Sequence, residues 1–127
     1  AIQRERDMCR VADLERIGRQ IRRADAFAPA GTNVNVVSAL GGNRLRMRTY
    51  ERGVEAETLA CGTGAVASAV VSVGRGMVTS PVEIVASSGM PLVASFALGQ
   101  NGARTVALRG QTRIVMTGSI RPDALVR

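Results

Sequence analysis

Histidine, lysine and tryptophan are absent from this chain, and aromatic residues make up only 2% of it. Without histidine the chain cannot supply the base of a Cys–His or Ser–His catalytic pair. The same absence argues against a zinc or haem site, so we expect no metal and no cofactor. With so few aromatic rings there is little on which nucleic-acid bases could stack.

Long apolar runs are missing as well. No segment approaches the roughly 20 consecutive apolar residues of a membrane-spanning helix. Residues 1–6 contain no apolar signal region. We therefore expect a cytoplasmic protein with no membrane partner. The chain opens with Ala1 rather than methionine, which indicates a processed chain or a fragment.

Arginine carries all of the positive side-chain charge, with 17 arginines against 10 acidic residues. Such an excess could suit nucleic acid. The distribution argues otherwise, because seven of the arginines precede Phe27 and are mixed with acids, as in a solvated helix. Three more, Arg44, Arg46 and Arg48, alternate with apolar residues, which is typical of the wet face of a strand. We expect no nucleic-acid partner.

The 127 residues, 46% of them hydrophobic, are enough for one domain with one core. Asp13 can cap a helix that runs to about Ala24, and a second helix is predicted from residue 62 to about 74. Residues 51–61 are predicted to be a loop. Strands are predicted at residues 32–40, 45–50, 82–86, 92–98, 105–108 and 112–117.

The second predicted helix carries polar side chains only at Ser68 and Ser72 within its apolar run, so we expect it to be buried on every side. A buried helix among six short strands predicts an α+β fold. In that fold a mixed sheet would curl into a barrel-like wrap around one central helix.

Cys61 is the main candidate for chemistry. It precedes Gly62, Thr63 and Gly64, and an apolar small-residue run follows, an order that predicts loop, cysteine and helix N-terminus. Free backbone N–H groups at such an end can hold a carboxylate, and the helix dipole favours a thiolate. The alternative is a small buried residue before a helix. Cys9 has no such context, and we interpret it as incidental, with no disulfide expected.

Glu51 and Arg52 are adjacent opposite charges in the predicted loop. Such pairs are usually solvated surface. An arginine fork nevertheless suits a carboxylate, and Glu51 could hold an ammonium group. Together they could recognise a second amino-acid head group at some distance from Cys61.

Four further polar residues can be interpreted either as structural or as functional. Asn33 and Asn35 lie two apart, on one face of a strand where asparagine is disfavoured. Either turn chemistry or ligand contact would explain them. Glu55 and Glu57 could act as acids or bases, but we interpret them as residues that keep the loop soluble.

Three segments, in this order and spacing, resemble the C-terminal half of diaminopimelate epimerase: GTNVN at residues 31–35, RTYERG at 48–53 and ETLACGTGA at 57–65. Residues 106–120 are similar but less specific. The resemblance implies a cofactor-independent epimerase that interconverts LL- and meso-diaminopimelate in lysine and peptidoglycan-precursor synthesis. It also implies two similar halves, each a barrel-like sheet around a central helix. One cysteine from each half would flank the substrate α-carbon.

By this resemblance Cys61 is the acid/base cysteine of the second half, and the amides of Gly62 and Thr63 hold the reacting α-carboxylate. The resemblance also implies that three side chains bind the distal amino-acid head group: Asn33, Glu51 and Arg52. The chemistry agrees, because inverting a stereocentre by proton transfer needs a base on one face and an acid on the other. Helix-end dipoles would stabilise the incipient carbanion through its carboxylate.

The first-half cysteine has no counterpart in this sequence. We therefore interpret residues 1–30 as an inter-half linker with a short helix and residues 31–127 as the C-terminal epimerase domain of a longer, truncated enzyme. The isolated chain is expected to be inactive, with the missing N-terminal half as its partner and a homodimer left open. The loop after Gly53 is one residue longer than the commonest family form, a length that bears on how Arg52 is aimed.

Two alternatives remain. The first is a related racemase, independent of pyridoxal phosphate, that acts on another amino acid of the histidine or proline type. Contact of Glu51 and Arg52 with a second head group would separate it from a diaminopimelate enzyme. The second is a non-catalytic half-domain that pairs with another chain. A basic RNA-binding module, which would bind with steep salt dependence, is not expected.

Overall fold

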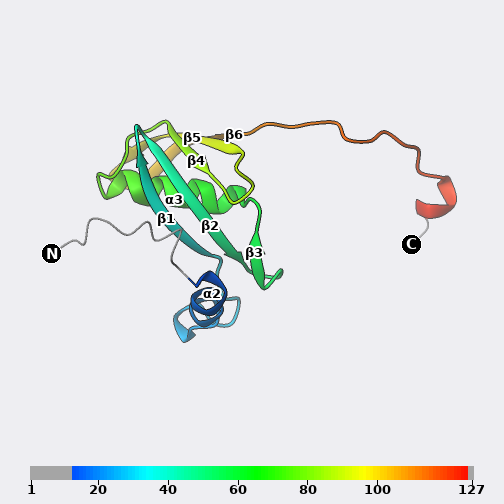
Figure 1. The fold of residues 1–127 in the computed structure, drawn as a ribbon, viewed down its shortest axis with the longest axis horizontal. Helices are drawn as coiled ribbons and strands as arrows, with labels where there is room; N and C mark the ends of the chain where they lie inside the picture. The colour runs from blue at the N-terminus through cyan, green and yellow to red at the C-terminus, as the bar shows by residue number, and fades with distance from the viewer. Residues whose placement is uncertain (1–12, 126–127) are drawn as a thin grey trace.

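A computed structural model of the chain describes residues 13–125 (Figure 1). Within that range the helices are α2 (Leu14–Arg22) and α3 (Gly62–Gly74), with short 3-10 turns at Asp25–Phe27 and Pro122–Leu125. The strands are β1 (Val34–Gly41), β2 (Arg44–Glu51), β3 (Ala56–Thr58), β4 (Val82–Val85), β5 (Pro91–Gly99) and β6 (Gly102–Arg109). None of the helices in these residues is long and apolar enough to cross a membrane.

The strands form one mixed sheet in the order β1-β2-β4-β5-β6, and β3 pairs with β2 off this path. All neighbours are antiparallel except β2 and β4, which run parallel. Helix α3 lies against this sheet, and α2 lies beyond the ends of β1 and β2 (Figure 1). The predicted α+β class with a mixed sheet is confirmed.

The predicted barrel-like wrap is wrong, because the sheet stays open. Strands β1 and β6 stand at opposite ends of the strand order and do not pair with each other in the described residues. Residues 112–117, predicted to be a strand, have no regular structure, and Figure 1 shows the chain after β6 running away from the sheet. Ile114 and Val115 are about nine-tenths exposed. A β-prone sequence forms a strand only where a neighbouring strand supplies its hydrogen bonds and packing.

Helix α3 begins and ends where the sequence predicts, but it is not buried on every side. Ala65 and Ala69 are fully covered, whereas Val71 is 53% exposed. An open sheet covers one face of a helix and leaves the other uncovered. The two serines lie on the covered face, and Ser68 Oγ donates a hydrogen bond to Met47 Sδ at 3.4 Å. Small residues there let the helix lie close to β2.

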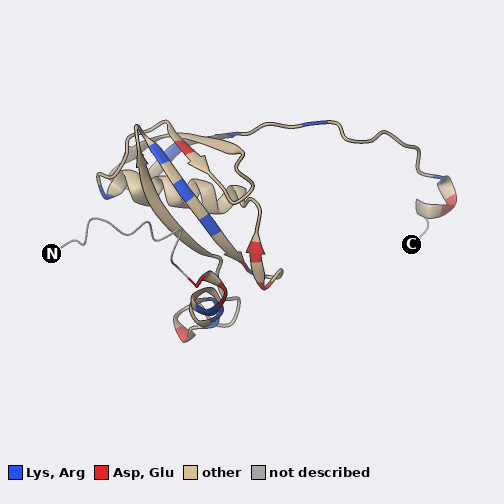
Figure 2. Cartoon of the chain, in the orientation of Figure 1, with Lys and Arg blue, Asp and Glu red and all other residues tan. Residues whose placement is uncertain are grey.

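The main core lies between α3 and the sheet. Leu45 and Met47 of β2 point into it, together with Ala65, Ala69, Val78, Val82, Ile84, Ala94 and Phe96. The arginines that alternate with Leu45 and Met47 form the row of basic residues along β2 in Figure 2. This confirms that the alternation marks the outer face of the strand. The alternate arginines also pair with acids, as Arg44 Nε does with Glu83 Oε1 of β4 at 2.9 Å.

The predicted loop at residues 51–61 contains a short strand, β3, and that part of the prediction is wrong. Glu57 of β3 pairs across the ladder with Tyr50. Its carboxylate accepts hydrogen bonds from Arg48 Nε at 2.9 Å and Arg48 Nη2 at 2.6 Å. Ser87 Oγ donates to the same carboxylate at 2.7 Å. These side-chain bonds add to the ladder that holds β3 beside β2. The spacing of apolar residues gives no sign of them.

Helix α2 confirms the predicted cap, since the Asp13 side chain accepts a hydrogen bond from the Arg16 amide at 3.2 Å. The helix buries Leu14 and Gly18. Leu14 forms a second small cluster with Val34 and Tyr50. Gly18 lies so close to the Tyr50 ring that a Cβ atom would collide with the ring carbons.

Replacing Gly18 by alanine is expected to destabilise the fold by about 1–3 kcal/mol, the usual range for overpacking, because the new Cβ would collide with Tyr50, which is buried in the cluster with Leu14 and Val34. Urea unfolding followed by circular dichroism measures this. Gly74→Ala is the matched control, since a Cβ at Gly74 meets nothing within 4 Å. That change should be neutral or slightly stabilising. Equal effects of the two variants would contradict the packing argument.

Candidate functional site

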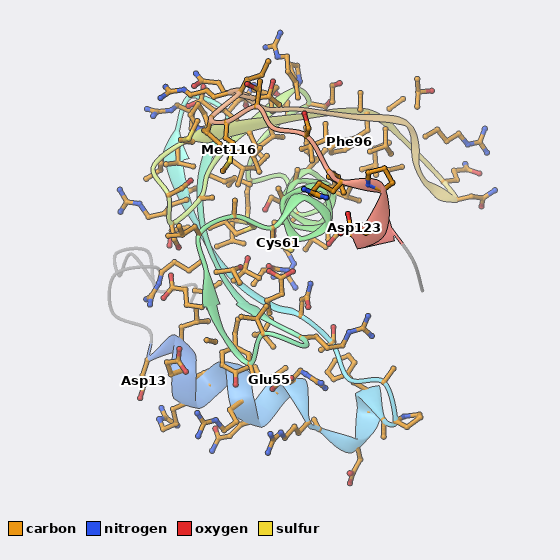
Figure 3. The ribbon with its side chains drawn as sticks, turned by 90° about the vertical axis from the view of Figure 1, so that its right-hand side faces the viewer. Asp13, Glu55, Cys61, Phe96, Met116 and Asp123 are labelled. Carbon is orange, nitrogen blue, oxygen red and sulfur yellow. The ribbon has the colours of Figure 1, made fainter. Side chains whose placement is uncertain are left out.

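Cys61 is the N-cap residue of α3, as the sequence predicts. Its backbone is extended, and its Sγ accepts a hydrogen bond from the Gly64 amide at 3.4 Å. The side chain is 5% exposed, yet it stands at the helix end, on the side of α3 nearer to α2 in Figure 3. The first-turn amides of an α-helix have no partner within the helix. The sulfur therefore lies beside backbone donors that can hold an anion.

Polar side chains surround the sulfur. Asn33 Nδ2 donates to it at 3.6 Å, and Thr63 Oγ1 is 3.5 Å from it. The Cys61 thiol donates to Glu51 Oε1 at 4.0 Å. Glu51 is held in place by Thr58 Oγ1, which donates to its other carboxylate oxygen at 2.8 Å. A residue buried only for packing would not be expected to collect this set of neighbours.

Arg52 joins the cluster through its backbone. Its amide donates to Asn33 Oδ1 at 2.8 Å, so the asparagine links Arg52 to the Cys61 sulfur. The structure thus brings Asn33, Glu51 and Thr63 to the Cys61 sulfur, with Arg52 joined to them through its backbone amide. It differs from the expectation in one respect, because Glu51 lies next to the sulfur rather than at a distance from it.

A pocket of about 320 Å³ opens beside this cluster. Its lining consists of Gly31, Thr32, Asn33, Asn35, Arg52, Thr63, Gly64 and Ala67. A second hollow of about 350 Å³ continues along α3 and shares Asn35 and Ala67 with the first. A small amino acid would fit this volume, since ligand pockets start at about 300 Å³.

Asn35 explains why glycine stands at position 64. A Cβ on Gly64 would lie 2.6 Å from Asn35 Oδ1 and 3.2 Å from Cys61 Sγ. The same Asn35 oxygen accepts a hydrogen bond from Thr49 Oγ1 at 2.7 Å, which ties β1 to β2. Turn chemistry and ligand contact were the two interpretations left open for the asparagines. Asn35 has a hydrogen-bond partner within the fold and also lines the pocket. The spacing of the glycines around Thr63 signalled the site but not this contact.

The interpretation of Glu55 and Glu57 as residues that merely keep the loop soluble is wrong. Glu57 is bound to Arg48, and its pKa is held below the usual range chiefly by that arginine and further by Ser87. Glu55 Oε1 accepts hydrogen bonds from Arg22 Nε at 2.9 Å and from the Gly53 amide at 3.2 Å. The Gly53 amide is the main cause that lowers the pKa of Glu55, and Arg22 adds to it. Charge alone gave no sign of these pairings.

Cys9, the other cysteine of the sequence, lies outside the described residues. Nothing in the geometry therefore bears on its interpretation as incidental. Within the described residues Cys61 is a free thiol.

Comparison with known proteins gives one consistent family. The diaminopimelate epimerase family model matches residues 6–121. The diaminopimelate epimerase of Aquifex aeolicus is 41% identical over 91% of this chain and 42% of its own length. That of Gemmatimonas aurantiaca is 43% identical over 85% of the chain and 42% of its own length. That of Methanothrix thermoacetophila is 51% identical over 66% of the chain and 29% of its own length. The chain spans less than half the length of these relatives.

Replacing Glu57 by glutamine should destabilise the fold at pH 7 by about 1–2 kcal/mol, because the charge-assisted bonds from Arg48 are lost. The pKa of Glu57 is lowered in the fold, so its contribution is present above the ordinary glutamate pKa of about 4.3 and disappears as the pH falls through the lowered value. The difference from wild type should therefore shrink as the pH is lowered from 7 toward 2.

Urea unfolding at pH 7 and near pH 2 measures this dependence. Glu83→Gln is the matched control, because its pair with Arg44 is more exposed and should contribute less at pH 7. An equal penalty for Glu57→Gln at both pH values would mean that the carboxylate charge is not the cause.

Proposed function

Because this chain belongs to the diaminopimelate epimerase family, we propose that it forms the C-terminal half of an enzyme that interconverts LL- and meso-diaminopimelate. The reaction would be a cofactor-independent α-proton transfer in lysine synthesis, in the cytoplasm. The carrying observation is the position of Cys61, whose sulfur caps α3 and faces Asn33, Thr63 and Glu51.

In this proposal Cys61 exchanges the proton on one face of the substrate α-carbon. The amides of Gly62 and Thr63, at the N-terminus of α3, hold the α-carboxylate. Negative charge spreads into that carboxylate as the proton leaves, and fixed dipoles at the helix end would stabilise it. Asn33, Thr63 and the Gly64 amide place hydrogen-bond donors beside the sulfur, where they can stabilise it when it carries negative charge.

The distal amino-acid head would bind to Asn33, Glu51 and Arg52. Arg52 lines the pocket and offers a bidentate fork for a carboxylate. Glu51 offers an acceptor for an ammonium group, and its contact with Sγ makes it a neighbour of the reacting centre as well. Recognition of a second head group is the feature that favours diaminopimelate over a histidine- or proline-type substrate.

The opposite face of the α-carbon needs a second acid/base group, since one thiol cannot act on both faces. We infer that a first half, outside this chain, supplies it, with residues 31–127 as the C-terminal domain and residues 1–30 as the linker. The uncovered face of α3 and the open sheet agree with a domain that meets another body. A homodimer or a non-catalytic pairing remains the alternative.

The chain alone should bind diaminopimelate weakly at this pocket. Titration of the labelled chain followed by NMR should shift the amide signals of Gly62, Thr63 and Arg52. Lysine, which lacks the second carboxylate, should bind at least about tenfold more weakly, because its terminal ammonium cannot engage the Arg52 fork. Arg52→Gln should remove that preference, whereas Arg104→Gln on β6 should not. Equal binding of the two amino acids would favour the other racemase.

In the enzyme that contains this chain together with its first half, Cys61→Ser should lower kcat at least about 100-fold, because the base on one face is lost. Incorporation of solvent deuterium at the α-carbon measures the turnover. Cys9→Ser is the control and should retain activity, and the isolated chain should show none. Near-normal turnover by Cys61→Ser, or full turnover by the isolated chain, would rule out the assignment.

A further inference from the structure

We propose that the ion pair between Arg22 and Glu55 positions the two walls of the pocket against each other, and so sets the aim of Arg52. The effect on substrate binding rests on the proposed function. The effect on the position of the turn from Glu51 to Glu55 does not depend on that function. Figure 3 shows Glu55 labelled beside α2, between that helix and the strands.

The first wall is the segment that leads into β1. Arg22 Nη1 donates to the Ala30 carbonyl at 3.4 Å. Gly31 follows at φ +67°, where a Cβ would collide with the Arg22 guanidinium. A positive φ and the lack of a side chain both favour glycine there. Arg22 therefore supports the backbone immediately before Thr32 and Asn33, which line the pocket.

The second wall is the turn from Glu51 to Glu55. The Glu55 amide donates to the Glu51 carbonyl at 2.8 Å, and Glu55 has φ 60°, which few residues other than glycine adopt. Its carboxylate accepts from the Gly53 amide and from Arg22 Nε. One side chain thus closes the turn that carries Glu51 and Arg52 and fastens it to α2.

Arg22 lies between the two walls and contacts both. It is only 18% exposed, and its partner Glu55 is 34% exposed. The second carboxylate oxygen of Glu55 is buried without a partner in the described residues. Removal of Arg22 would leave that carboxylate without its main countercharge, a costly state. The turn would then have to move, and with it the Arg52 amide that binds Asn33.

The chain offers a matched control in Arg44 and Glu83. Their Nε–Oε1 distance is also 2.9 Å, but the pair lies on the outer face of β2 and β4 and touches neither wall of the pocket. If the loss of any surface ion pair loosened the Arg52 turn, variants of Arg44 or Glu83 would have the same effect as variants of Arg22 or Glu55. If the Arg22–Glu55 pair positions the turn, only its own variants will loosen it.

The test is amide hydrogen exchange by NMR on the full 127-residue chain. Glu55→Gln and Arg22→Gln should speed exchange of the Arg52 amide at least about tenfold, while core amides such as Ile84 keep their wild-type rates. Arg22→Lys retains the charge and should stay nearer to wild type. Glu83→Gln should leave Arg52 unchanged. An unchanged Arg52 rate in Glu55→Gln, or uniform acceleration that includes the core amides, would overturn the positioning role.

Diaminopimelate binding by the same variants separates this inference from the proposed function. Glu55→Gln should weaken binding severalfold and reduce the preference over lysine, as Arg52→Gln does. If the wild-type chain binds no diaminopimelate, the proposed function fails while the exchange measurement still decides the positioning role. If Arg52 exchange accelerates but diaminopimelate binding is unchanged, the pair does not aim Arg52 and the inference fails.

Discussion

The close contact between the first turn of α3 and strand β1 is the constraint on which the site depends. Gly64 leaves room for the side-chain oxygen of Asn35 and for the sulfur of Cys61, and any Cβ there would displace one or both. Since Asn35 is in turn bonded to Thr49, the helix end, β1 and β2 are joined at one point. Cys61 becomes the helix cap as a result, with its sulfur directed toward backbone donors instead of into the core.

The site combines a rigid part and a part that needs support. Cys61 and Thr63 belong to the helix end, and rigid elements hold functional groups more accurately than loops do. Glu51 and Arg52 stand where β2 runs into a tight turn, which has no core residues of its own. Contacts outside the pocket supply the support, since Thr58 holds Glu51 and the Arg22–Glu55 pair holds the turn. Helix α2 therefore contributes to the site without lining it.

The exposed apolar surfaces of the chain are of the kind that a domain buries against another domain. Val71 on the outer side of α3 and the apolar residues 114–116 are exposed, away from the described core. Exposed apolar patches of this kind commonly mark interaction surfaces. Because the chain spans less than half the length of its relatives, we propose that a first half covers these surfaces.

Local chemistry was readable in the sequence. The Asp13 cap and the start of α3 at Gly62 follow from short-range patterns, because each depends on neighbours within a few residues. The motifs that resemble the epimerase family supplied the roles that we propose for the residues of the site.

Only the tertiary structure decided what depends on distant partners. Strand β3 pairs with β2 and is fastened to it by Arg48 and Glu57. Strands β1 and β6 do not pair, and residues 112–117 have no strand partner in the part of the chain that the structure describes. Ser68 faces inward because Met47 accepts its hydrogen bond. Such outcomes depend on contacts between segments far apart in the chain, which residue spacing does not encode.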